Sequence, residues 1–128
     1  MRGEGINRLG LLSSEALTDL FELDSAARVN ALERRRPDSV RIEHPVHGRA
    51  VLRDNKPLSD SALERCLTDD MMPPQWYRTL NQFVFLWPSE KRMTELLSAR
   101  AHRSSAHLVL EFDTADLVAH HAAHIWLS

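Results

Sequence analysis

The stretch Val40-Arg-Ile-Glu-His-Pro-Val-His-Gly-Arg-Ala-Val-Leu-Arg53 predicts two short strands joined by a turn. Residues 40–42 alternate apolar and polar side chains, as an edge strand does, and residues 49–53 form the next strand. Pro45 and Gly48 mark a turn or bulge between them. We therefore expect part of the fold to be a sheet of short strands.

Two helices are predicted before this stretch. The first runs over residues 13–21, where serine hydroxyls can cap it and leucines recur at helical spacing. The second begins with Asp24 or Ser25 as its cap and runs to the Arg34–Arg36 triplet, where Pro37 stops it. Cationic side chains suit the negative end of a helix, so this position gives the triplet a structural explanation.

Helices and strands also alternate after this stretch. Further helices are expected from Ser59 or Asp60, from Pro73-Pro74, from Pro88 or Ser89, and over Ala115–His121 with Thr114 as cap. The strongest strand pattern is Phe83-Val-Phe-Leu-Trp87, followed by His107–Phe112 and a strand beginning at Ile125–Leu127. Because residues 83–87 are apolar on both faces, they are expected to form a central strand covered on each side.

The order of these elements predicts an α+β fold, with a small curved mixed or antiparallel sheet and several short helices. With 128 residues we expect a single domain over residues 1–128. Leu9-Gly-Leu-Leu12 resembles the end of a preceding element, and the chain stops as a strand begins. The chain is therefore expected to be cut at both ends.

Composition narrows the class of protein. A net charge of −2 argues against nucleic-acid binding by bulk electrostatics. The single cysteine, Cys66, excludes an internal disulfide and a cysteine-based zinc site. No secretory signal and no apolar run of membrane-spanning length is present, so a cytoplasmic protein is expected.

The stretch His44–Pro57 is unusually rich in hydrogen-bond donors and ionisable groups. Arg49 and Arg53 share one side of the predicted strand, and His47 precedes it by a turn. Such a row of guanidinium groups could hold a pyrophosphate. It could equally be the solvent face of an edge strand protected by charge.

Other constellations have structural explanations. His120, His121 and His124 are better explained as a solvated helix end than as a zinc site, so no metal is expected. Asp113 and Asp116 suit the first turn of a helix. With four glycines, the chain has no phosphate-binding glycine loop, and it shows no nucleophile elbow, so no catalytic residue is identified.

Five segments together resemble an uncharacterised bacterial domain family, and they cover nearly the whole chain. They are residues 31–40, 45–59, 76–87, 96–103 and 108–114. The segment from the arginine triplet to Pro57-Leu58 is also distantly similar to ADP-ribosyltransferases of the DarT type, which modify DNA bases using NAD.

The resemblance implies an ADP-ribosyltransferase-like fold with NAD as cofactor in a cleft of a split, curved sheet. It implies nucleic acid only as an acceptor, and it makes Arg36, His47, Arg49 and Arg53 the candidate cofactor-binding residues. Such families place a histidine on an upstream strand and a glutamate late in the chain. Neither position is matched here, and we do not assign the acid to Glu111.

Two hypotheses from different classes follow. The first is an incomplete or shortened ADP-ribosyltransferase-like domain that keeps part of an NAD or nucleotide cleft. The second is a non-catalytic binding or assembly module that uses residues 44–57 and open sheet edges, with a homo-oligomer as one form. A hydrolase based on His47 has no supporting spacing.

Overall fold

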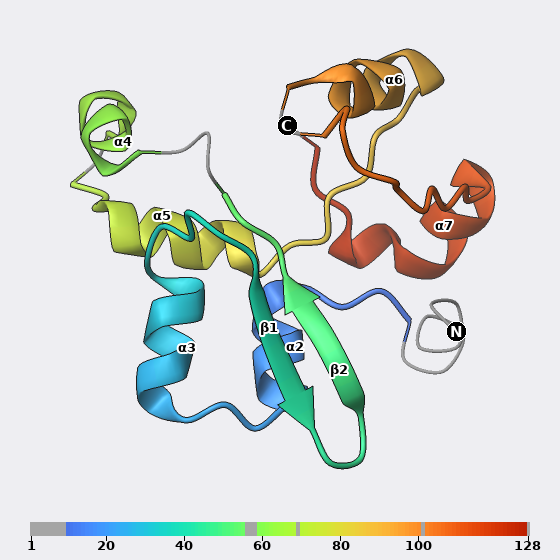
Figure 1. Cartoon of the computed structure of the whole chain (residues 1–128). Coiled ribbons are helices and arrows are strands. Elements are labelled where there is room, and N and C mark those ends of the chain that lie inside the picture. Colours follow the sequence, from blue (N-terminus) through green and yellow to red (C-terminus); the bar gives the residue numbers. More distant parts are fainter. Residues whose placement is uncertain (1–9, 56–58, 69, 101, 128) are drawn as a thin grey trace. The chain divides into compact units, whose positions relative to one another are not determined.

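A computed structural model describes residues 10–55, 59–68, 70–100 and 102–127. These ranges form six α-helices, one 3-10 helix and a two-stranded antiparallel hairpin (Figure 1). The protein is therefore a mostly helical α+β protein. The chain divides into two compact units, Met1–Leu86 and Trp87–Ser128, which are described separately below.

The described residues of the first unit form four helices and the hairpin. In chain order these are α2 (Ser14–Leu20), α3 (Ser25–Leu32), β1 (Val40–His44), β2 (Gly48–Leu52), α4 (Asp60–Cys66) and α5 (Pro73–Asn81). The side chains of Ser13, Asp24 and Ser59 accept backbone N–H groups at the starts of α2, α3 and α4. These are the capping contacts that the sequence predicts.

The hairpin confirms the two strands and the turn predicted around Pro45 and Gly48. Strand β1 pairs with β2 in antiparallel register, from Val40 opposite Leu52 to His44 opposite Gly48. Gly48 has a φ of +76°, a conformation that side chains other than glycine adopt at a cost. Glycine at this position therefore lets the chain enter β2 without strain.

The core of the first unit lies between the hairpin and the first two helices, with α2 behind the strands in Figure 1. It consists of Phe21, Ala31, Leu32, Ile42 and Leu52, with Leu17, Leu20, Leu23 and Ala50 packed against it. Alternation along each strand sends Ile42 and Leu52 into this core. The opposite face of the hairpin is left to solvent.

Helix α5 is held to the other helices by polar contacts. The Tyr77 hydroxyl donates to Oδ1 of Asp60 at 2.7 Å, which joins α5 to α4. Arg78 donates to Glu33 at 2.6 Å and to Glu15 at 3.4 Å, which joins α5 to α3 and α2. The helices of this unit therefore share ion pairs as well as apolar contacts.

The second unit contains α6 (Glu90–Ser98), α7 (Thr114–His121) and the 3-10 helix η1 (Ala122–His124). Ser89 caps α6 as predicted, whereas Asp113 takes the capping position that we expected for Thr114. Neither α6 nor α7 has a buried residue. All the buried residues of the described chain belong to the first unit.

Three predicted strands are wrong. Residues 83–87, 107–112 and 125–127 form neither helix nor strand. The predicted central strand instead exposes all five side chains, between 37% for Phe83 and 54% for Phe85. A strand needs a neighbour for its backbone hydrogen bonds, and none of the described residues supplies one. The small curved sheet is thus reduced to one hairpin, and an ADP-ribosyltransferase-like fold is not shown.

The predicted end of the second helix is also wrong. Helix α3 stops at Leu32, before the arginine triplet. Arg36 then folds back and its guanidinium donates to the carbonyl of Ala31 in the last turn. Arg36 therefore contacts the helix end from beyond it, and the triplet does not form the last turn of the helix.

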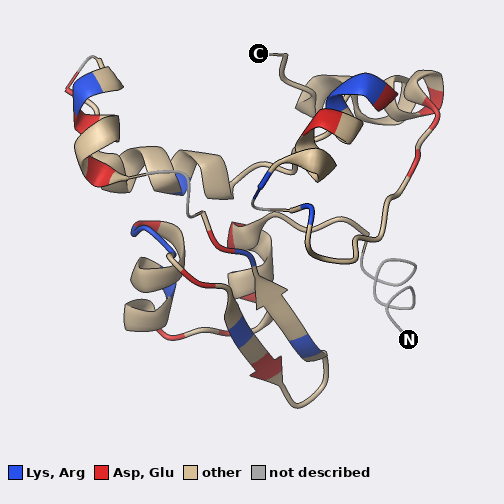
Figure 2. Cartoon of the chain, turned by 45° about the horizontal axis from the view of Figure 1, so that its top comes forward, with Lys and Arg blue, Asp and Glu red and all other residues tan. Residues whose placement is uncertain are grey.

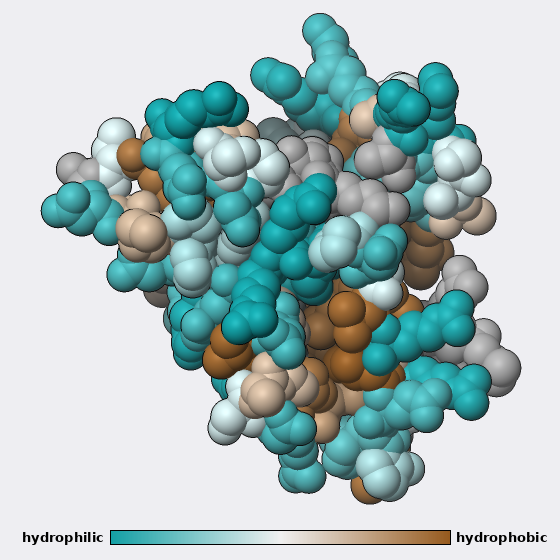
Figure 3. Space-filling view, turned by 60° about the vertical axis from the view of Figure 1, so that its left-hand side comes forward, coloured by the Kyte–Doolittle hydropathy of each residue, from teal (hydrophilic) through white to brown (hydrophobic). Residues whose placement is uncertain are grey.

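Apolar side chains also reach the protein surface, where Figure 3 shows them among hydrophilic ones. Across the described ranges, every helix falls short of the length and apolar character needed to cross a bilayer.

Candidate binding site at the hairpin

The outer face of the hairpin carries four exposed side chains in two cross-strand pairs. Arg41 lies opposite Val51, and Glu43 lies opposite Arg49. Figure 2 shows these basic and acidic positions on the two strands. Val51 is 53% exposed although it is apolar. Because the inner face is buried, this outer face is the part of the hairpin that a ligand can reach.

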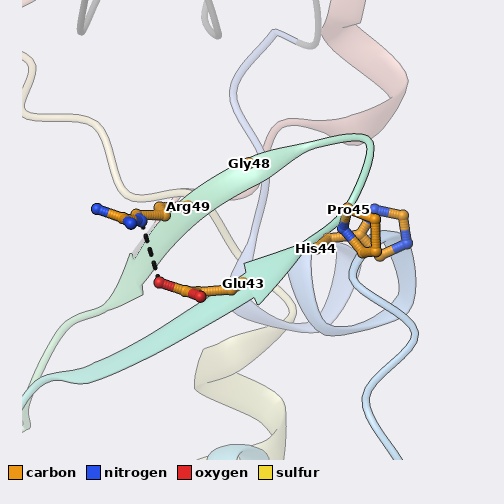
Figure 4. A pocket seen from close by; sticks show the side chains of 5 residues that line it. All are labelled: Glu43, His44, Pro45, Gly48 and Arg49. Carbon is orange, nitrogen blue, oxygen red and sulfur yellow. Dashed lines mark ion pairs between the residues drawn. The ribbon is translucent and has the colours of Figure 1, made fainter.

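A shallow, open recess lies at the turn end of the hairpin (Figure 4). Its volume is about 340 Å³, and it is lined by Glu43, His44, Pro45, Gly48 and Arg49. Nε of Arg49 lies 3.0 Å from Oε1 of Glu43, and both side chains are mostly exposed. An anion entering this recess would have to compete with the Glu43 carboxylate for Arg49.

Two histidines stack beneath the turn. The rings of His44 and His47 are 4.7 Å apart, and the ring of Phe21 lies 5.9 Å from His44. Nδ1 of His44 accepts the backbone N–H groups of Val46 and His47 at 3.2 and 3.3 Å. Its Nε2 lies 3.7 Å from Oε2 of Glu22. His44 therefore connects the turn to the segment between α2 and α3.

His47 is held in this stack with one nitrogen out of water. Its Nδ1 is buried and meets no hydrogen-bond partner among the described atoms. A buried nitrogen without a partner is costly, and more so when it carries charge. The ring of His47 therefore packs under the turn. It lies close to the recess but is not among the residues that line it.

Arg36 is buried in the first unit, away from solvent. Its Nε donates to the carbonyl of Arg53 at 2.9 Å, and its Nη2 donates to Oδ1 of Asn81 at 3.0 Å. With the bond to Ala31, the guanidinium joins the end of α3, the exit of β2 and the end of α5. Burial lowers the pKa of Arg36, and the nearby Asp54 carboxylate opposes that shift.

The four candidate cofactor-binding residues are therefore placed differently. Arg49 lines the recess and His47 lies in the stack next to it. Arg53 follows the end of β2 and does not line the recess. Four residue-to-residue steps of extended chain separate its Cα atom from that of Arg49 by about 13 Å. The guanidinium of Arg36 is bonded to the protein itself. Residues 56 and 57 of the predicted stretch, and Leu9 near the start of the chain, lie outside the described residues.

Val51 shares the face of Arg49, as alternation along the predicted strand indicates. Sequence reasoning missed Arg41, which lies opposite Val51 on this outer face. The register of the two strands could have indicated Arg41, because a period of two places residues 41, 43, 49 and 51 on one face. Glu22, which faces His44, carries no comparable sequence signal.

Within the described residues, no group of three or more His, Cys, Asp or Glu side chains is arranged to hold a metal ion. Of the three histidines near the C-terminus, His120 contacts the carbonyl of Asp116 in its own helix at 2.8 Å.

No curated protein and no solved structure matches the chain. One family model matches residues 3–128, which is nearly the whole sequence. The chain therefore belongs to the family of unknown function DUF7002.

Proposed function

We propose that this protein is a binding module that holds an extended acidic segment of a partner protein against its hairpin. The observation that carries the proposal is the exposed pair of Arg41 and Val51, adjacent to Arg49 on the same face. A guanidinium beside an exposed apolar side chain offers both a charge contact and apolar contact area.

The charge of this face supports an acidic partner. The outer face carries Arg41 and Arg49 against the single carboxylate of Glu43. Arg49 already pairs with Glu43, whereas Arg41 makes no ion pair with any described residue. This face is therefore locally positive in a chain whose net charge is −2. Such a field favours an acidic partner and speeds its association.

The edges of the hairpin support an extended partner. In the described part of the chain, the sheet has two strands, so each strand lacks a second neighbour. An extended peptide can pair with such an edge through its main chain, while alternate side chains supply specificity. A segment that alternates acidic and β-branched residues would match both the edge and the outer face.

Fluorescence anisotropy with two labelled octapeptides tests this proposal. One alternates Glu and Val and the other alternates Lys and Val. We expect the Glu peptide to bind and Arg41→Glu to weaken it more than tenfold, about 1.4 kcal/mol. Arg65→Glu, a charge-matched change at an exposed position of α4, serves as control and should leave binding unchanged. Equal binding of both peptides, or equal loss in both variants, would contradict the proposal.

A second candidate is nucleotide binding at the recess, as in a shortened ADP-ribosyltransferase-like domain with NAD as its ligand. The observation in its favour is that Arg49 and His44 line the same recess, with His47 stacked beside it. Guanidinium groups suit pyrophosphate oxygens. Arg36 is not part of this candidate nucleotide site, because its guanidinium is hydrogen-bonded within the protein.

Thermal denaturation with NAD, ADP-ribose or ATP tests the second candidate. A specific ligand at about 100 times its dissociation constant should stabilise the protein by roughly 2.7 kcal/mol. Arg49→Ala should abolish that shift while leaving the melting temperature without ligand nearly unchanged, since Arg49 is exposed. The same test on Arg53→Ala shows whether the two arginines act together. No shift with any of the three nucleotides rejects this candidate.

A further inference from the structure

We infer that the hairpin turn is a proton-sensitive element that His44 holds closed only while its Nδ1 is unprotonated. This inference concerns the turn itself and holds whichever partner the hairpin binds.

The geometry of the turn requires an acceptor at this position. Two backbone N–H groups, from Val46 and His47, both point at Nδ1 of His44, at 3.2 and 3.3 Å. The side chain acts as Asn or Asp does when it accepts N–H groups two and three residues ahead in a turn. An imidazole accepts at Nδ1 only when the proton is on Nε2. The turn therefore fixes the neutral Nε2–H tautomer of His44.

Protonation of His44 converts this acceptor into a donor. Nδ1–H would then face two other N–H groups, and both turn hydrogen bonds would be lost. The ring cannot easily turn away, because it is stacked on His47 and packed at an angle against Phe21. Rearrangement of the turn is the remaining way to separate the donors.

Four titratable or charged side chains face His44. Oε2 of Glu22 lies 3.7 Å from Nε2 of His44, and the Glu22 side chain is 82% exposed. The ring of His47 is stacked on that of His44 at 4.7 Å. Glu43 and Arg49 line the same recess as His44 and pair with each other at 3.0 Å.

Opening of the turn would also affect the recess, since His44, Pro45 and Gly48 all line it. Histidine gains its proton between about pH 8 and pH 5, so acidification over this range should change the recess without unfolding the core. His44 is the group through which pH would act on this end of the hairpin.

Nuclear magnetic resonance on the labelled full chain tests this inference. The amide signals of Val46 and His47 are followed from pH 8 to pH 5, together with the ring signals of His44. We expect both amides to lose their hydrogen-bond shift as the His44 ring titrates. Signals from Leu32 and Leu52 in the core should stay in place, which separates opening of the turn from unfolding.

His44→Asn is the matched variant. Asparagine before Pro45 keeps an acceptor oxygen for the two N–H groups but cannot take up a proton in this range. We expect its turn amides to be independent of pH. Amides that stay in place in the wild-type protein while His44 titrates would overturn the inference, and so would an identical transition in His44→Asn.

Discussion

Arginines at neighbouring positions serve different purposes in this protein. Arg34 is exposed, whereas Arg36 is buried and bonded to three separate segments. The two are indistinguishable in sequence, where they form one basic run before a proline. Burial of Arg36 depends on acceptors supplied by Arg53 and Asn81, which are 17 and 45 residues away. Contacts at such distances along the chain cannot be read from a local pattern.

We predict that Arg36→Ala destabilises the protein strongly. The substitution leaves the carbonyls of Ala31 and Arg53 and the amide oxygen of Asn81 without their donor. Buried acceptors that lose a charged partner typically cost about 3 kcal/mol in total. Urea denaturation should show a lower midpoint with an unchanged slope.

Arg34→Ala is the control for that experiment, because it removes the same charge from an exposed position two residues earlier. The free energy of unfolding of this variant should stay within about 0.5 kcal/mol of that of the wild type. Equal effects of the two substitutions would mean that charge, and not the hydrogen bonds of Arg36, stabilises this region.

Tyr77 gives a prediction for alkaline pH. Burial, and then its hydrogen bond to Asp60, raise the pKa of Tyr77 from 10.0 to about 12. The unfolded chain therefore releases this proton first, so stability should be constant below about pH 10 and fall between pH 10 and 12. Tyr77 is the sole tyrosine, so the ultraviolet absorbance of its phenolate reports this pKa directly.

Tyr77→Phe should remove the decline in stability between pH 10 and 12, on the order of 2 kcal/mol at 1.36 kcal/mol per pKa unit. A phenolate midpoint near pH 10 in protein whose circular dichroism is still native would disprove the raised pKa.

At the scale of elements, helices with caps were predictable and isolated strands were not. Ser13, Asp24, Ser59 and Ser89 each cap a helix at the predicted place, because a cap acts on backbone groups within three residues. The hairpin was predictable because its two strands pair across a three-residue turn. Residues 83–87 have the strand composition without a partner, and composition cannot provide one.

The conformation of Gly48 is the element-scale test of the hairpin. A Cβ at this position meets nothing within 4 Å, so only its φ of +76° opposes a side chain. Gly48→Ala should therefore cost about 1 kcal/mol, and Gly48→Asn less, because asparagine tolerates this conformation. Melting temperatures of both variants measure the difference. An alanine variant as stable as the asparagine variant would contradict this explanation.

At the scale of the whole molecule, buried residues are distributed unevenly. Every buried residue of the described chain belongs to the unit Met1–Leu86, although the family match covers residues 3–128. The candidate site was predictable only in part. Residues 44–49 could be identified because they are neighbours in the sequence. Burial of Arg36 could not be predicted, because it depends on packing among α3, β2 and α5.

Hydrogen exchange should reveal this uneven distribution. None of the side chains of α6 and α7 is buried, so the amides of these helices should open more easily than those of α3 and α5. We expect protection factors at least about tenfold lower in α6 and α7, which corresponds to 1.4 kcal/mol. Equal protection in all four helices would mean that the second unit gains stability from contacts outside those described.

The bonds of Arg36 also bear on how the first unit assembles. One guanidinium closes loops of 5, 17 and 45 residues at a single point. The longest of these closures is the slowest to find, since its entropy cost grows with loop length. We therefore expect these contacts among α3, the end of β2 and α5 to form late in folding and cooperatively. Disruption of this junction should then accelerate unfolding more than it slows refolding.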